Sequence, residues 1–173
     1  MSDQDAKKDR VVFRVNPSLY AAISEQASSA NRSVNGEICT ALDKWLYERD
    51  SMVLMKDRLM ASTSAEAITV IRKATPSYLI VSGEEADTRK TNVRLKESLE
   101  ADLRAAWESH KSEVGPVSLN SFLKHVVSWW LIYSYQMEQC AKALHKDFNN
   151  SIRPPARGAA IISSLTYGSL ALA

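Results

Sequence analysis

The sequence reads RVVFRVNPSL over residues 10–19 and KTNVRLKESL over residues 90–99, and the expected fold is built outward from these two stretches. They superpose at a constant offset of 80 positions. Further along, SVNGEICTALDKWL (33–46) superposes on SLNSFLKHVVSWWL (118–131) at an offset of 85. The five extra residues fall in the turn of the second copy, between residues 99 and 118, where insertions are tolerated. Two matching segments in the same order indicate an internal duplication.

Each copy begins with a period-two pattern that predicts a β-strand. The residues expected to face the core are Val11, Phe13 and Val15 in the first copy and Thr91, Val93 and Leu95 in the second. Two amphipathic helices follow in each copy, and the second of them begins after Ser33 or Ser118, both good N-cap residues. The predicted unit is therefore strand, helix, helix.

One such unit leaves its strand unpaired and buries too little apolar surface to fold alone. Two units overcome both problems when their strands pair antiparallel and their four helices pack together. We therefore predict a mainly α fold with a short two-stranded antiparallel β-ribbon and extra helices. The outward face of the ribbon would carry Arg10, Val12, Arg14, Lys90, Asn92 and Arg94. A two-stranded ribbon fits the major groove of B-DNA, where Arg, Lys and Asn read base edges and a valine suits a thymine methyl.

The stretch RSVNGEI (32–38), after an FRV-type strand, resembles the ribbon-helix-helix family, the Arc and MetJ superfamily of bacterial and phage DNA-binding proteins. The likeness is greatest to the Arc-type repressors, and it covers roughly half of the chain. It implies a tandem ribbon-helix-helix protein whose outward strand residues contact bases. It also implies that the start of each second helix binds a DNA phosphate, and the residues concerned are Ser33, Val34, Asn35, Ser118, Leu119 and Asn120. Backbone amides at a helix N-terminus favour such an anion.

The chain departs from the family in a polar cluster. Arc-type proteins can carry a buried Arg-Glu-Arg set, whose first two members match Arg32 and Glu37, but Ala41 occupies the third place. The second copy has only apolar residues there, namely Val117, Phe122 and Val126. Apolar replacement of such a cluster is compatible with folding. The departure therefore leaves the expected fold standing.

The ribbon can form in two ways. Pairing within one chain gives one asymmetric ribbon, whereas pairing between like strands of two chains gives two symmetric modules, and the sequence leaves both open. We divide the chain into a flexible N-terminal arm (1–9), a first unit (10–50), a helical insert with an acidic linker (51–88), a second unit with an extended last helix (89–150) and a C-terminal tail (151–173).

Composition argues against several other classes of protein. The chain has 173 residues, with 22 Lys and Arg against 20 Asp and Glu, so its charge alone names no partner. Its two cysteines and three scattered histidines show no metal-ligand spacing, and no catalytic set or cofactor motif is visible. No apolar run is long enough for a membrane span, and the first ten residues do not resemble a signal peptide. We therefore expect a cytoplasmic protein that is not an enzyme and binds no metal, cofactor or membrane.

The expected function is sequence-specific binding of double-stranded DNA through the major groove, by a bacterial, plasmid or phage transcriptional regulator such as a repressor. One alternative is an accessory DNA-binding protein at a plasmid conjugation origin (a relaxosome) or a partition site. Another is an antitoxin or protein-interaction adaptor that binds a partner through the insert or the tail. A helical scaffold without DNA contact is a third. Assembly of several copies on DNA is compatible with each DNA-binding alternative.

Overall fold

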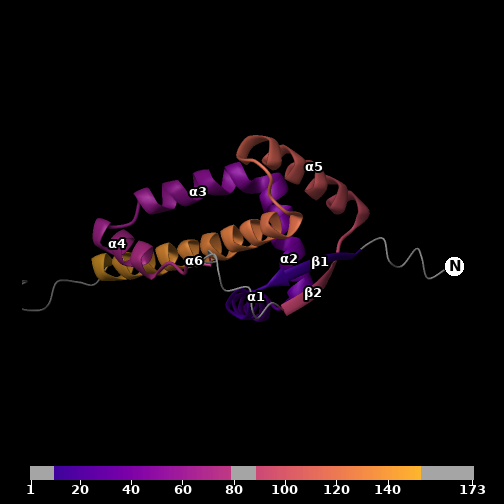
Figure 1. Cartoon of the computed structure of the whole chain (residues 1–173). Coiled ribbons are helices and arrows are strands. Elements are labelled where there is room, and N and C mark those ends of the chain that lie inside the picture. Colours follow the sequence, from indigo (N-terminus) through magenta and orange to yellow (C-terminus); the bar gives the residue numbers. More distant parts are fainter. Residues whose placement is uncertain (1–9, 79–88, 153–173) are drawn as a thin grey trace, which may run out of the picture.

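The computed structural model describes residues 10–78 and 89–152 and confirms a mainly helical fold with one two-stranded antiparallel sheet. The N-terminal arm, the acidic end of the insert and residues 153–173 of the tail lie outside the described residues. The elements are β1 (Arg10–Val15), α1 (Pro17–Ser29), α2 (Val34–Asp43), the π-helical turn η2 (Lys44–Glu48), α3 (Arg49–Ala61), α4 (Ala65–Ala74), β2 (Arg89–Arg94), α5 (Glu97–Val114) and α6 (Leu119–Ile152) (Figure 1).

The sheet pairs β1 with β2 of the same chain. Val12 lies opposite Asn92, the residue that holds its place in the second copy, so the ribbon has an approximate two-fold axis at this pair. Alternate residues of β1 are buried, as are Val93 of β2 and Leu95 just beyond it. Thr91, predicted to face inward, is half-buried.

Local polar contacts fix where the first two helices begin and end. The side chain of Asn16 accepts a hydrogen bond from the Leu19 amide (2.8 Å), and Pro17 occupies the first helical position, where its missing N–H costs nothing. At the other end of α1, Asn31 adopts the left-handed region (φ 55°), and the Arg32 amide bonds back to the Ala27 carbonyl (2.7 Å). This Schellman turn reverses the chain into α2.

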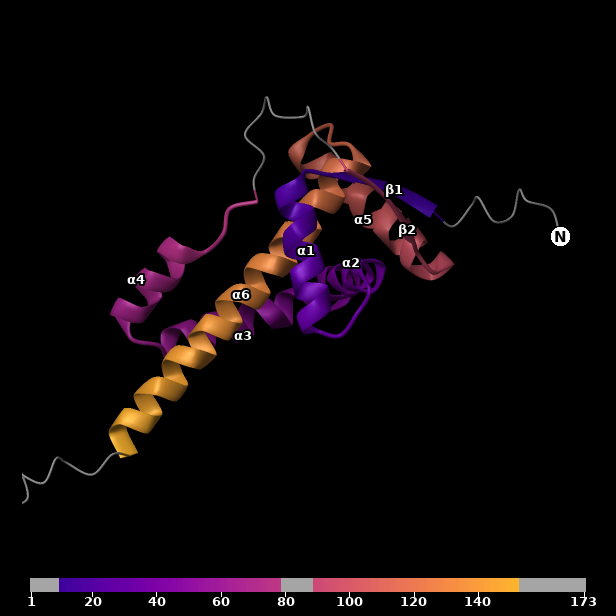
Figure 2. The ribbon, with the colours of Figure 1, turned by 90° about the horizontal axis from the view of Figure 1, so that it is seen from below.

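The two copies share one core. The second helix of each copy packs against the strand and the first helix of the other copy. Helix α6 contacts β1 and α1, and α2 contacts β2 and α5 (Figure 2). The buried cluster draws equally on the two copies and contains Val11, Phe13, Val15, Leu19, Ile23, Ile38, Ala41, Leu42, Val93, Leu95, Leu103, Phe122, Leu123, Val126, Val127 and Leu131. Because each such side chain contributes about 1.5–3 kcal/mol on burial, neither copy keeps its core without the other.

The insert adds a helical arm away from the ribbon. Helices α3 and α4 both pack against α6, whose 34 residues run from the ribbon to the far end of the molecule (Figure 1). The extended last helix that the sequence predicted is thus used as the support for the insert. Within this arm Thr63 bonds to the Leu59 carbonyl (2.9 Å), and Ser64 caps α4.

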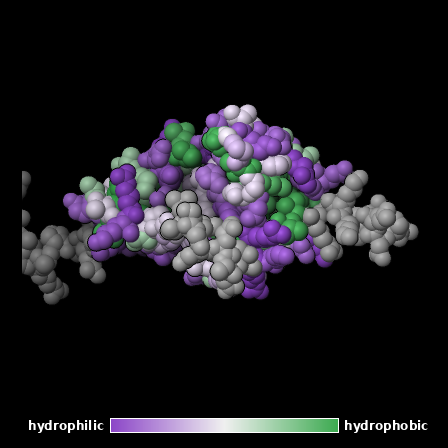
Figure 3. Space-filling view, viewed as in Figure 1, coloured by the Kyte–Doolittle hydropathy of each residue, from purple (hydrophilic) through white to green (hydrophobic). Residues whose placement is uncertain are grey.

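On the side seen in Figure 3, hydrophobic residues of the described surface lie in several areas among hydrophilic ones. Among the described helices, none combines the length and the hydropathy that crossing a membrane requires.

Candidate nucleic-acid interface

The outward face of the ribbon brings together the residues that the sequence placed there. Val12 is 49% exposed, and Arg14, Lys90, Asn92 and Arg94 are also exposed. The register sets Val12 beside Asn92 at the centre and Arg14 beside Lys90 at one end. Arg10 pairs with Arg94 at the other end through its backbone. Within the described part of the chain, none of the four polar side chains of this face makes a hydrogen bond or ion pair, so all four can contact a ligand.

Two asparagines hold the outer edges of the ribbon crosswise. Asn120, in the first turn of α6, accepts a hydrogen bond from the Arg14 amide (2.7 Å) and donates one to the Arg14 carbonyl (3.0 Å). Asn35, in the first turn of α2, makes the same two bonds to Arg94 (2.8 and 3.3 Å). An unpaired strand edge exposes backbone groups, and here an amide side chain from the other copy satisfies one residue of each edge.

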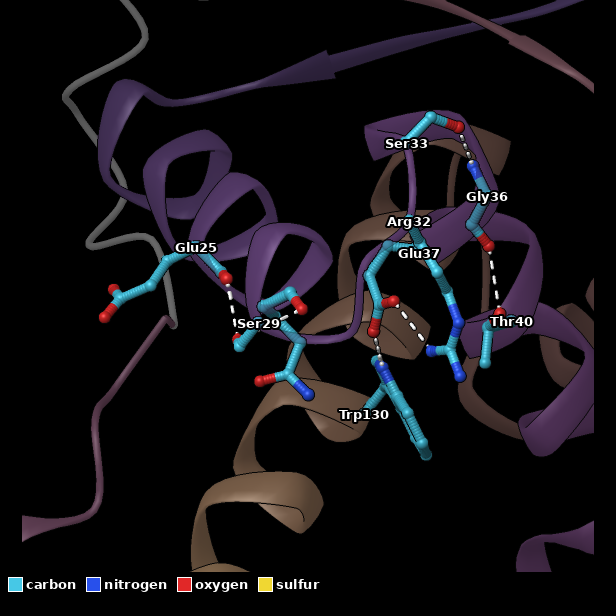
Figure 4. Close-up of polar contacts among 9 residues, drawn as sticks. Glu25, Ser29, Arg32, Ser33, Gly36, Glu37, Thr40 and Trp130 are labelled. Carbon is cyan, nitrogen blue, oxygen red and sulfur yellow. Dashed lines mark hydrogen bonds and ion pairs between the residues drawn. The ribbon is translucent and has the colours of Figure 1, made fainter.

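The hydrogen bonds of Asn35 and Asn120 to the strands bring the starts of α2 and α6 to the two sides of the ribbon. In α2 the Gly36 amide bonds to Ser33 Oγ (3.0 Å), as Figure 4 shows, and the Glu37 amide to the Ser33 carbonyl (2.9 Å). The amides of Val34 and Asn35 have no such bond within the described residues. In α6 the cap is Ser118, which accepts from the Ser121 amide (3.1 Å) and leaves the matching amides of Leu119 and Asn120 open.

These open amides belong to residues that the sequence predicted to bind a DNA phosphate. A helix N-terminus with free amides and a positive dipole end attracts an anion. The side chains of Asn35 and Asn120 hold the ribbon instead, so only the main-chain amides of these two residues remain open to an anion.

The buried carboxylate of Glu37 has a partner that the sequence did not reveal. Its side chain is 1% exposed and makes an ion pair with Arg32 (2.9 Å). The indole N–H of Trp130, from the second copy, donates to its other oxygen (2.6 Å), as Figure 4 shows. The carboxylate of Glu37 therefore receives its second hydrogen bond from a tryptophan 93 residues further along the chain.

The corresponding position in the other copy holds an apolar contact in place of the hydrogen bond between Trp130 and Glu37. Trp45 corresponds to Trp130 in the second overlay, and Phe122 corresponds to Glu37. The rings of Trp45 and Phe122 meet edge to face with their centroids 6.4 Å apart. Trp45 also contacts His125 (5.0 Å) and Trp129 (5.2 Å), so its ring packs against neighbouring rings of α6.

The two flanks of the ribbon differ at one position beside the asparagines. Cys39 of α2 corresponds to Lys124 of α6. The Cys39 thiol lies 3.5 Å from the Arg94 carbonyl, and burial raises the pKa of this thiol although a hydrogen bond from Asn35 opposes the shift. Lys124 is therefore a cation of α6 at the position where α2 has a neutral thiol, although Lys96 lies close enough to that thiol to act on its pKa.

The described residues contain no cluster of three or more His, Cys, Asp or Glu that could hold a metal ion. Comparison of the chain with family models, with curated proteins and with solved structures gave no match. The interface therefore has to be interpreted from its own residues.

Proposed function

We propose that the chain is a tandem ribbon-helix-helix protein that inserts its ribbon into the major groove of double-stranded DNA, as a bacterial, plasmid or phage transcriptional regulator. The single observation that carries this proposal is the arrangement around the ribbon. The exposed face of the ribbon carries the cationic side chains of Arg14, Lys90 and Arg94. On each side of this face lies the start of a helix with two open amides.

The dimensions of the ribbon support the proposal. Four residue steps separate the first and last outward residues of a strand, which is about 13 Å at about 3.3 Å per residue. Two strands lie about 5 Å apart, and the major groove of B-DNA is about 12 Å wide. The ribbon can therefore enter the groove with its outward side chains directed at base edges.

The flanking helix starts give the contacts that position a protein on the duplex. Phosphate contacts contribute affinity and fix register, whereas base contacts determine sequence preference. The described ribbon face supplies the second kind of contact, and the open amides beside it supply the first. One chain thus carries both parts of a complete DNA-reading surface.

The test is a binding titration with the full chain, first against a library of random duplexes and then against the selected sequence. We expect Arg14→Ala and Arg94→Ala each to weaken binding to the selected duplex by about 1–3 kcal/mol, because each removes a bidentate contact to guanine. Binding to random duplexes should weaken less. Equal losses on both duplexes would reject base reading, and a library without enrichment would reject the proposal.

Arg72→Ala is the matched control. Arg72 is exposed on α4, a helix that lies away from the ribbon (Figure 1), and its loss changes the net charge equally. Binding of the selected duplex should then stay close to that of the unaltered protein.

The cellular role follows from where the protected DNA lies. Protection of a promoter beside the protein's own coding sequence supports a regulator. Protection beside a nick site supports the relaxosome alternative, and co-purification of a stoichiometric toxin supports an antitoxin.

A further inference from the structure

The two central outward residues of the ribbon differ in chemistry although they hold the same place in the two copies. Val12 presents an exposed apolar side chain, and Asn92 presents an exposed amide. They lie opposite each other in the register. In contrast, Arg14 and its counterpart Arg94 are identical, and Arg10 and its counterpart Lys90 are both cations.

The hydrogen bonds at the ribbon edges show how close the central pair lies. Arg14 and Arg94 use their backbone groups for Asn120 and Asn35, so they do not exchange hydrogen bonds with their cross-strand partners. Pairs alternate along an antiparallel ladder, and Val12 and Asn92 lie two residues from these positions. Val12 and Asn92 therefore also form a pair without hydrogen bonds between its two residues, the type whose Cα atoms lie about 4.5 Å apart.

Base-edge chemistry gives each central residue a different preferred partner. An asparagine amide makes two hydrogen bonds to adenine N6 and N7, and an aliphatic side chain contacts the thymine methyl. One A·T pair presents both groups in the major groove, on opposite strands. Arginine and lysine at the ends of the ribbon prefer guanine.

We infer that the ribbon reads a central A·T base pair in one fixed orientation, with adenine under Asn92 and thymine under Val12, between flanking G·C pairs. This inference rests on the proposed function. Its consequence is that the protein binds a directional site, so one molecule points a given way along the duplex. Reversing the central pair reverses the protein.

The experiment uses a selected duplex whose flanks are made palindromic, so that only the central pair distinguishes the two directions. The full chain carries an iron chelate that cleaves DNA, attached to Ser18→Cys or Ser98→Cys. Both serines are exposed, and they hold matched positions at the starts of α1 and α5. We expect each chelate to cleave predominantly on one side of the centre, with the two proteins cleaving opposite sides.

The expected bias is about 5- to 150-fold, the discrimination of one bidentate base contact. Inverting the central A·T pair should exchange the cleaved sides. The double variant Val12→Asn/Asn92→Val should exchange them on the original duplex, because it swaps the two readers without changing composition.

Cleavage of both sides equally on bound DNA would overturn the inference, and so would selection of a central G·C pair. Either outcome leaves DNA binding itself intact. Absence of selective binding by the unaltered chain would instead overturn the proposed function. Circular dichroism of each variant confirms that its helices are retained, which is expected because the altered side chains lie on the surface.

Discussion

Glu37 shows how a single residue couples the two copies. A buried carboxylate is costly unless its oxygens are hydrogen-bonded, and each oxygen of Glu37 has its own donor. Arg32 supplies one donor from the adjoining turn, and Trp130 supplies the other from α6. The carboxylate therefore stabilises one particular placement of the long helix.

Trp130→Phe is expected to lower the free energy of unfolding by about 1–3 kcal/mol, because it leaves one buried carboxylate oxygen without a donor. Urea titration of the full chain measures this change. Trp45→Phe is the control, since Trp45 occupies the matching position and contacts the ring of Phe122. A loss as large in the control as in Trp130→Phe would show that ring size, and not the hydrogen bond, matters at this position.

At the scale of elements, the starts of α2 and α6 serve stability and the proposed DNA contact through different atoms. Ser33 and Ser118 cap their helices through the side chain, whereas the amides of the next two residues remain open. The two roles can therefore be separated by substitution at the cap.

Ser33→Asp and Ser118→Asp should keep or raise stability, because aspartate is a good N-cap and its charge favours the positive end of the helix. They should weaken DNA binding by about tenfold or more, since a carboxylate at this site repels a phosphate. Ser64→Asp at the start of α4 makes the same change away from the ribbon and is the control. Unchanged DNA binding in the first two variants would remove these helix starts from the interface.

The contact between α5 and α6 places His125 where its pKa is lowered. Desolvation lowers the pKa of His125, and the nearby His110 and Arg49 lower it further. The His110 and His125 rings stack with centroids 5.9 Å apart. The unfolded chain thus binds this proton more readily, so His125 costs no stability above about pH 6.5 and costs progressively more as the pH falls below it.

We therefore expect the free energy of unfolding to fall between pH 7 and pH 5, and His125→Gln to reduce this slope. Urea titrations across that range measure the effect. His145→Gln, on the outer part of the same helix, is the control for the substitution itself. An unchanged slope in His125→Gln would remove this residue as the cause.

At the scale of the whole molecule, the shared core implies that the two copies fold as one unit. Fragments 1–83 and 84–173 should each lack the cooperative unfolding of the intact chain, because each carries only half of the buried cluster. An equimolar mixture should restore it, as followed by circular dichroism. A stable dimer of either fragment alone would instead favour pairing between like strands.

The sequence predicted the elements of the fold, but it did not predict most of the contacts between them. The alternation around Phe13 predicted one strand and its repetition around Val93 predicted a second, because both patterns are local. The pairing of these two strands within one chain was left open by the sequence and is given by the structure. The bonds from Asn35 and Asn120 to the opposite strands span 59 and 106 residues, so no local pattern reports them. The signal in the sequence was that Asn35 and Asn120 are identical in the two superposed segments.

The arm was beyond prediction for a similar reason. The sequence indicated helices in the insert and a long last helix, but not that the former would pack on the latter. That packing depends on which apolar stripes meet in space, as at Met52 and Ile71, which are buried on two different helices.

Joining β1 and β2 in one polypeptide changes how such a protein would respond to its own abundance. A reader assembled from two separate chains is diluted apart, so its occupancy falls steeply when few copies are present. Strands tethered in one chain meet at an effective concentration in the millimolar range whatever the number of molecules. Under the proposed function, occupancy of DNA would then rise in simple proportion to the number of molecules, even when only a few are present.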